Sequence, residues 1–189
     1  MVNGTTIVAA SIIVAFQESP TLVNWAFFPR SAALPPVAEK LVQAFKECLP
    51  SFASDKHKLA SNAVLACMAP SLGRIGFQVE GGKHKAGKVS VPVLFGRNGK
   101  VDKSFDADAY HREAELVLEV EAGRAVVNNQ FLKDLFQACM MQGVRYLAIA
   151  VRNNYRGADD FENVFRFFDT LYTSDRLKLP LGGVLLIGY

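Results

Sequence analysis

The chain has 189 residues, enough for one domain whose core buries a sheet of several strands. Half of the residues are hydrophobic and 21% are charged, which excludes a disordered chain and a coiled coil. The formal net charge of +3 permits contact with a polyanion but does not require it. Cys48, Cys67 and Cys139 have no zinc-site or disulfide-framework spacing, so we expect reduced core residues in a cytoplasmic protein.

The sequence of the N-terminal third indicates no membrane-spanning segment. The apolar run 7–16 is shorter than the about 20 residues that cross a bilayer, and no Lys or Arg precedes it, so a buried strand or short helix is expected. Prolines and aromatic residues predict irregular structure over 19–36. A helix is expected at 37–49, ended by Pro50, and a second helix after a cap at Ser54, interrupted or kinked at Pro70.

Strand patterns follow from residue 76 onward. A short strand at 76–80 and a basic loop at 81–88 precede an alternating run at 89–95, which Pro92 assigns to a sheet edge. The Asn98-Gly99 turn pairs this run with 102–110 in a hairpin, and 116–122 completes a three-stranded meander. The remaining pattern predicts, in order, a helix from 128, a strand at 146–151, a helix at 159–172 and a strand at 183–187. The predicted class is an α/β sandwich with helices flanking a central mixed sheet.

Carboxylates gather on the last two strands of the predicted meander. Glu119 and Glu121 share one strand face, and Asp106 and Asp108 share a face on the preceding arm. A tight return would bring at least one aspartate beside Glu119. Such a cluster raises its own pKa values unless a cation lies within it, and hard oxygen ligands favour Mg²⁺ or Mn²⁺. The alternative is a solvated outer strand face, which two acids in alternation also predict.

The order Asp108, Glu119, Val120, Glu121 resembles the Asp…(Asp/Glu)-x-Lys signature of the restriction-endonuclease-like, PD-(D/E)xK, superfamily of nucleases. More narrowly, it resembles the BamHI/BglII-like branch, in which an acid replaces the lysine. The resemblance is carried by three blocks, 108–111, 118–124 and 134–137, and covers roughly residues 55–155. It implies a restriction-endonuclease-like αβββαβαβ order in a single domain over 1–189, with an N-terminal extension and helix (1–54), a nuclease core (55–155) and a C-terminal helix and strand (156–189).

The resemblance also implies an endonuclease that hydrolyses DNA phosphodiester bonds with Mg²⁺ or Mn²⁺. Asp108 and Glu119 would hold the metal, with the Val120 carbonyl as a further oxygen and Asp106 as a competing ligand. Glu121 would take the lysine position as general base or water-orienting group. Nucleases of this fold that cut both strands generally dimerise, so a homodimer is expected. The alternative is a non-catalytic module that binds nucleic acid or a protein partner.

Several polar residues are weaker candidates for DNA contacts, each with a plain structural alternative. Arg124 would hold a phosphate or neutralise Glu121. On the helix after the acids, either Gln137 or Lys133 would face the site. The other candidates, read otherwise as ordinary turn or surface residues, are Asn62, His111, the loop residues Lys83, Lys85 and Lys88, and the segment 152–155 after a buried strand.

Overall fold

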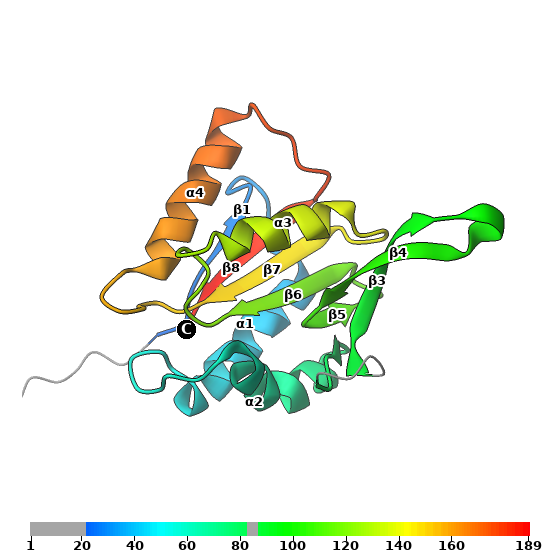
Figure 1. The fold of residues 1–189 in the computed structure, drawn as a ribbon. Coiled ribbons are helices and arrows are strands. Elements are labelled where there is room, and N and C mark those ends of the chain that lie inside the picture. Colours follow the sequence, from blue (N-terminus) through cyan, green and yellow to red (C-terminus); the bar gives the residue numbers. More distant parts are fainter. Residues whose placement is uncertain (1–21, 83–86) are drawn as a thin grey trace, which may run out of the picture.

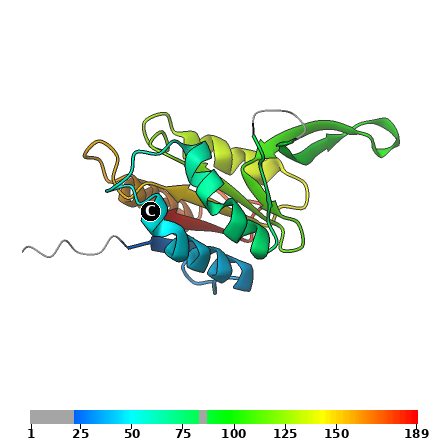
Figure 2. The same ribbon diagram turned by 90° about the horizontal axis from the view of Figure 1, so that it is seen from below.

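The computed structural model describes residues 22–82 and 87–189. Its centre is a six-stranded sheet in the order β1-β8-β7-β6-β5-β2, with helices on both faces (Figures 1 and 2). The β6–β7 and β7–β8 pairs are parallel and the other pairs antiparallel, which confirms the predicted α/β sandwich with a mixed sheet. The strand bounds are β1 Asn24–Phe28, β2 Gln78–Val79, β5 Ala109–His111, β6 Leu116–Glu121, β7 Tyr146–Val151 and β8 Gly183–Gly188.

Two helical layers cover the sheet. One face carries α1 (Pro36–Cys48), the short 3₁₀ helix η1 (Leu49–Ser51) and α2 (Ser61–Arg74), and the other carries α3 (Gln130–Met140) and α4 (Asp160–Ser174). Strand β6 alternates between them: Leu118 and Val120 pack in the α1/α2 core, whereas Val117 packs in the α3/α4 core. The odd-numbered positions of β6 therefore face α3, and Glu119 and Glu121 are among them.

A hairpin extends from the body of the protein (Figure 1). Its strands, β3 (Val89–Phe95) and β4 (Val101–Ala107), form a separate two-stranded antiparallel sheet. The turn η3 (Arg97–Gly99) places Asn98 at φ 59° and Gly99 at φ 72°, the left-handed conformation that these residue types tolerate best. The predicted hairpin is confirmed. So is the edge position of Pro92, because in the described chain β3 pairs with β4 alone.

The predicted single strand at 102–110, and with it the meander, is wrong. The chain bends at Asp108, so that β4 belongs to the hairpin and β5 to the central sheet, where it pairs with β2 and β6. Ala107 and Ala109, on either side of the bend, are both buried. Periodicity in the sequence does not mark this change, because it depends on which distant strand each half pairs with.

Three N-terminal expectations also differ from the structure. The stretch predicted to be irregular contains β1, which pairs along its whole length with β8. The two strands are more than 150 residues apart in the sequence, and the prolines around β1 favoured the prediction of irregular structure. Helix α2 begins at Ser61 rather than after Ser54, and it runs through Pro70 because Met68 and Leu72 beside it are anchored in the core. Cys67 is exposed rather than buried, although all three cysteines are free as expected.

The remaining N-terminal expectation, a strand or helix at 7–16, lies outside the described residues. Across the described ranges, no helix is long and apolar enough to cross a membrane. The segments predicted as an N-terminal extension and a C-terminal addition contribute β1 and β8, so both belong to the same sheet as the segment predicted to be the core.

Candidate active site

Asp108 and Glu119 are brought together by the bend between β4 and β5. The Val120 backbone N–H donates to Asp108 Oδ2 at 2.8 Å, which fixes the Asp108 carboxylate against β6. Ala109 stands opposite Leu118 in the β5–β6 ladder, so Asp108 lies level with Glu119. Glu121 follows two residues later on the same face of β6. The structure thus juxtaposes the three carboxylates whose order resembles the nuclease signature.

A fourth carboxylate, which the sequence analysis did not select, comes from α3. The Asp134 side chain is only 2% exposed, and within the described chain its Oδ2 atom has no hydrogen-bond partner. Its position was detectable: Phe131, Leu135 and Ala138 form the buried stripe of α3, and Asp134 stands within that stripe at helical spacing. The Asp134 side chain does interact with Lys133, through its other oxygen, and with Glu121, because a hydrogen bond between the two acids contributes to the raised pKa of Glu121.

The four carboxylates disfavour each other's ionised forms. Burial raises the pKa of Asp108 to about 6, and burial together with the charge of Asp134 raises the pKa of Glu121 to about 7. Burial and the neighbouring Asp108 carboxylate raise the pKa of Glu119 well above its ordinary value. The pKa of Asp134 is also raised, again chiefly by burial. Burial and mutual repulsion therefore favour the protonated forms of these acids in the metal-free protein.

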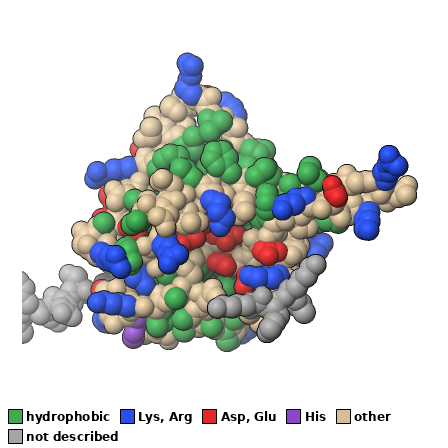
Figure 3. Space-filling view, in the orientation of Figure 1, with side chains coloured by type: hydrophobic (Ala, Val, Ile, Leu, Met, Phe, Trp, Pro, Cys, Tyr) green, Lys and Arg blue, Asp and Glu red, His purple; other side chains and the backbone are tan. Residues whose placement is uncertain are grey.

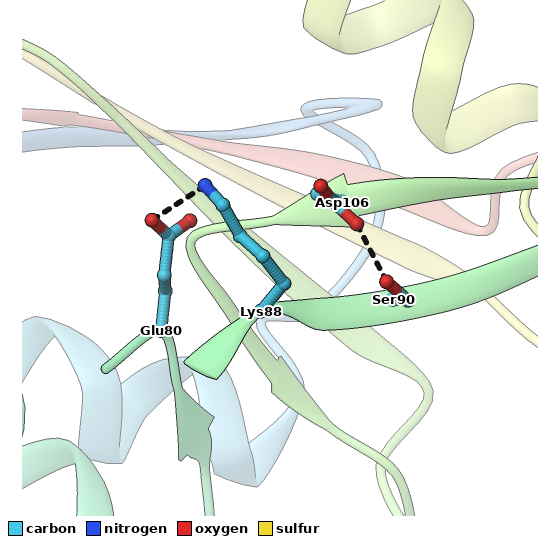
Figure 4. A network of polar contacts seen from close by, with 4 residues as sticks. All are labelled: Glu80, Lys88, Ser90 and Asp106. Carbon is cyan, nitrogen blue, oxygen red and sulfur yellow. Dashed lines mark hydrogen bonds and ion pairs between the residues drawn. The ribbon is translucent and has the colours of Figure 1, made fainter. Parts of the chain in front are cut away.

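Two lysines reach the edge of the cluster. Lys133 Nζ lies 3.5 Å from Asp134 Oδ1 and lowers the pKa of Glu119 and Glu121, against the larger effect of burial. Lys88 Nζ lies 2.6 Å from Glu80 Oε1 (Figure 4) and lowers the pKa of Asp108. Of the two α3 candidates, Lys133 is thus close enough to the acids to affect their pKa values. The Lys88–Glu80 pair places a cation beside the bend.

Asp106 is separated from the other acids. It is exposed on β4 and accepts a hydrogen bond of 2.6 Å from Ser90 Oγ across the hairpin (Figure 4). The bend at Asp108 turns β4 away from the central sheet, so the shared face expected for Asp106 and Asp108 does not form. This geometry favours Asp108 over Asp106 as the partner of Glu119.

The other predicted contact residues divide into three groups. Arg124 and Asn62 line a pocket at the carboxyl end of β6 together with Glu121, whereas Gln137 is half-buried one turn beyond Asp134 on α3. His111 lies at the opposite end of β6, paired with Leu116. Its Nδ1 accepts from the Ala114 N–H at 3.1 Å and its ring contacts Phe77, which is a turn role. Lys83 and Lys85 lie outside the described residues.

The surface around the site has a distinct charge pattern. Acidic side chains gather at the centre of the face shown in Figure 3, with lysine and arginine side chains at several places around them and on the hairpin. A negatively charged centre within a basic surround suits a polyanion that approaches a bound cation.

The residues provide a partial set of metal ligands. Within 22–82 and 87–189, no three His, Cys, Asp or Glu side chains form a group spaced to hold a metal ion. Mg²⁺, however, commonly uses one or two protein carboxylates and completes its shell with water and substrate phosphate. Asp108 and Glu119 offer two carboxylates side by side on neighbouring strands.

The turn after β6 depends on a glycine. Gly123 has φ +97°, and a Cβ atom there would lie 2.4 Å from the Tyr155 ring. Gly157 has φ +84° with open space around it, so an alanine there would pay only the cost of the left-handed backbone and no steric clash. We expect Gly157→Ala to lower the free energy of unfolding by about 1 kcal/mol. Gly123→Ala should lower it by roughly 1 to 3 kcal/mol more, because the ring must also move. Chemical denaturation of both variants measures the difference, and equal losses would contradict the packing of Tyr155 on Gly123.

The comparisons with known proteins are sparse. No family model matches the chain, and no curated protein matches it. Among solved structures, free BglII is similar with a TM-score of 0.47 and 12% sequence identity, over 88% of this chain and 78% of that chain. At this level, the similarity assigns neither a family nor an activity to the chain.

Proposed function

We propose that the protein is a restriction-endonuclease-like, metal-dependent phosphodiester hydrolase that acts on DNA with Mg²⁺ or Mn²⁺. The observation that carries the proposal is the convergence of Asp108, Glu119, Glu121 and Asp134 from the bend, β6 and α3 on one partly desolvated place. Four carboxylates kept together at the expense of stability are best explained by a cation and the chemistry that it supports.

Each carboxylate has a distinct role in this proposal. Asp108 and Glu119 hold the cation, with the Val120 carbonyl as a further oxygen. When bound, the cation would supply Lewis acidity to water and neutralise phosphate charge. Glu121, whose pKa lies near 7, accepts the proton of the attacking water. Asp134 acts through Glu121: its charge keeps the Glu121 carboxylate basic enough for that transfer.

In this proposal the hairpin contacts DNA. Its outer half carries Arg97, Lys100 and Lys103, and a two-stranded ribbon fits the major groove of B-DNA. Leu94 and Phe95 are exposed beside these cations. We propose that the hairpin positions the duplex across the acids, and that two copies of the chain act as a homodimer in the cytoplasm to cut both strands.

A second candidate is a restriction-endonuclease-like module without catalysis that binds nucleic acid or a protein partner. It is favoured by the acid at position 121, where the signature has lysine, and by the incomplete ligand group within the described residues. The two candidates differ in one property that is simple to measure, which is the affinity for a divalent cation.

Calorimetric titration with Mn²⁺ and nicking of supercoiled plasmid in Mg²⁺ or Mn²⁺ test the proposal together. We expect binding and nicking by the wild-type protein, with both lost in Asp108→Asn. Asp106→Asn is the matched control, because it removes an aspartate two residues away that lies outside the cluster, and it should keep both activities. If Asp106→Asn loses Mn²⁺ binding and nicking while Asp108→Asn keeps them, the assignment of Asp108 as a metal ligand is wrong. A protein that shifts the plasmid in a gel but neither binds Mn²⁺ nor nicks DNA would favour the second candidate, the module without catalysis.

A further inference from the structure

A pocket of about 1370 Å³ opens beside the acids at the carboxyl ends of β6 and β7. Four cationic side chains line it, namely Lys58, Arg124, Arg152 and Arg156, against the two carboxylates of Asp55 and Glu121. In the described part of the chain, neither Arg124 nor Arg156 forms an ion pair with an acidic side chain. The pocket is therefore positive, and two of its guanidinium groups are available to a ligand.

Of the three arginines, Arg152 is buried, whereas Arg124 and Arg156 are exposed. Arg152 is only 7% exposed, and its Nη2 donates to the Leu59 carbonyl at 2.5 Å. Arg152 and Arg156 both lie against the Tyr155 ring, at 5.2 and 5.1 Å from its centroid. Tyr155 in turn packs on Gly123, directly before Arg124. One aromatic ring thus contacts two cations of the loop after β7 and the glycine that precedes Arg124.

The backbone of the second loop is also fixed. Tyr155 N–H donates to the Ala158 carbonyl at 2.8 Å, and Ala158 N–H donates back to the Tyr155 carbonyl at 3.0 Å. The Asn154 side chain accepts from Gly157 N–H at 3.2 Å. This turn presents Arg156 in a left-handed conformation, φ 52°, toward the pocket. A preorganised arginine loses little conformational freedom when it binds an anion.

Helix α2 supplies a further positive contribution. Its first residues, Ser61 and Asn62, line the pocket, and its N-cap residue is Ala60, whose side chain cannot cap it. The Ser61 hydroxyl instead accepts a hydrogen bond of 3.0 Å from Ala122 N–H, which ties the helix start to the end of β6. The N-terminus of this 14-residue helix therefore adds its dipole to the cationic side chains.

We propose that this pocket binds a phosphate group of a nucleic-acid strand, next to the phosphate at the acids. Guanidinium groups and a helix N-terminus recognise phosphate oxygens, and the volume accommodates a nucleotide. Glu121 lines the pocket, and Ala122, which also lines it, lies about 10 Å along the strand from Glu119, so a phosphate in the pocket is not the one at the acids. The choice of ligand rests on the proposed function; the cationic pocket itself does not.

Fluorescence anisotropy of a labelled thymidylate octamer, in EDTA with the full-length protein, tests the pocket without any metal. One octamer carries a 5′-phosphate and one does not. We expect Arg124→Gln and Arg156→Gln each to weaken binding about 10-fold and to reduce its salt dependence. The matched control is Arg166→Gln, which removes an exposed arginine of α4 that pairs with Glu162 outside the pocket, and it should bind as the wild type does.

The two octamers distinguish a terminal phosphate from an internal one. A loss confined to the 5′-phosphorylated octamer supports a pocket for a strand end, and an equal loss on both supports an internal phosphodiester. Wild-type affinity in both pocket variants, or an equal loss in Arg166→Gln, overturns the proposal. Because no metal is present, a protein that binds through the pocket but never cleaves DNA would refute the proposed hydrolase alone. Cleavage with no effect of the arginine variants would refute the pocket alone.

Discussion

Glu119→Gln is expected to abolish metal-dependent cleavage and, at the same time, to stabilise the metal-free protein. Glu119 lies opposite Asp108 and two residues before Glu121, and its pKa is raised by burial and by the charges of Asp108, Asp134 and Glu121. Glutamine keeps the size of the side chain but removes its charge, so the proposed cation loses a ligand and the remaining acids lose a repulsive neighbour. Plasmid nicking should fall at least about 10²-fold, while the melting temperature at pH 8 in EDTA should rise.

The opposite signs of these two effects separate a functional carboxylate from a structural one. A glutamate that only supports the fold would lose stability on substitution, and its loss of activity would follow from unfolding. Asp106→Asn provides the control, because Asp106 is exposed and hydrogen-bonded to Ser90. Asp106→Asn should leave plasmid nicking unchanged and should change the free energy of unfolding by no more than about 0.5 kcal/mol. A Glu119→Gln protein that melts earlier than the wild type at pH 8 would contradict the assignment of Glu119 to a strained, cation-seeking cluster.

The stability of the metal-free protein should fall as the pH rises from 5 to 8. The folded-state pKa of Asp108 is about 6 and that of Glu121 about 7, both above the ordinary values of 3.8 and 4.5. The folded state therefore holds these protons more tightly than the unfolded chain does. Their contribution is present at low pH and is lost as the pH rises through the two folded-state values.

The expected size is on the order of 2 kcal/mol, since each unit of pKa shift is worth about 1.4 kcal/mol and solvent screens the partly exposed Glu121. For a chain of this length, that is roughly 4 to 8 °C in melting temperature. Millimolar Mn²⁺ at pH 8 should restore the loss by binding only the folded state. Differential scanning calorimetry across pH, with and without Mn²⁺, measures both effects. Equal melting temperatures at pH 5 and 8 would show that the four acids do not interact as the structure places them.

Much of the fold was predictable because its signals are local. The helix at α1, the Asn98-Gly99 hairpin and the buried strands β7 and β8 follow from periodicity, turn chemistry and apolar runs that a few neighbouring residues determine. Strand β1 and the bend at Asp108 were not predictable in this way. Each depends on pairing with a strand far along the chain, and local patterns do not encode such partners.

The candidate site, like the fold, could be predicted from the sequence where its signals are local. Alternation along β6 correctly placed Glu119 and Glu121 on one face, and their spacing to Asp108 selected the aspartate that the structure puts beside them. Asp134 was overlooked because α3 contributes it from another layer of the fold. The pocket at Arg152 and Arg156 was only suggested by its position after β7, since its charge becomes apparent when two loops and the start of α2 meet.

The strand that changes sheets at Asp108 has a mechanical consequence. One continuous stretch of backbone carries the basic turn at its outer end and the proposed cation ligand at its inner end, where Val120 N–H fixes the carboxylate. A force or an ordering event at the turn is transmitted to Asp108 through covalent bonds. Thermodynamic linkage then makes the coupling reciprocal: if a cation at Asp108 restricts the hairpin, a duplex held by the hairpin must strengthen cation binding by the same factor. The hairpin would thus couple the binding of the proposed duplex to the binding of the proposed cation.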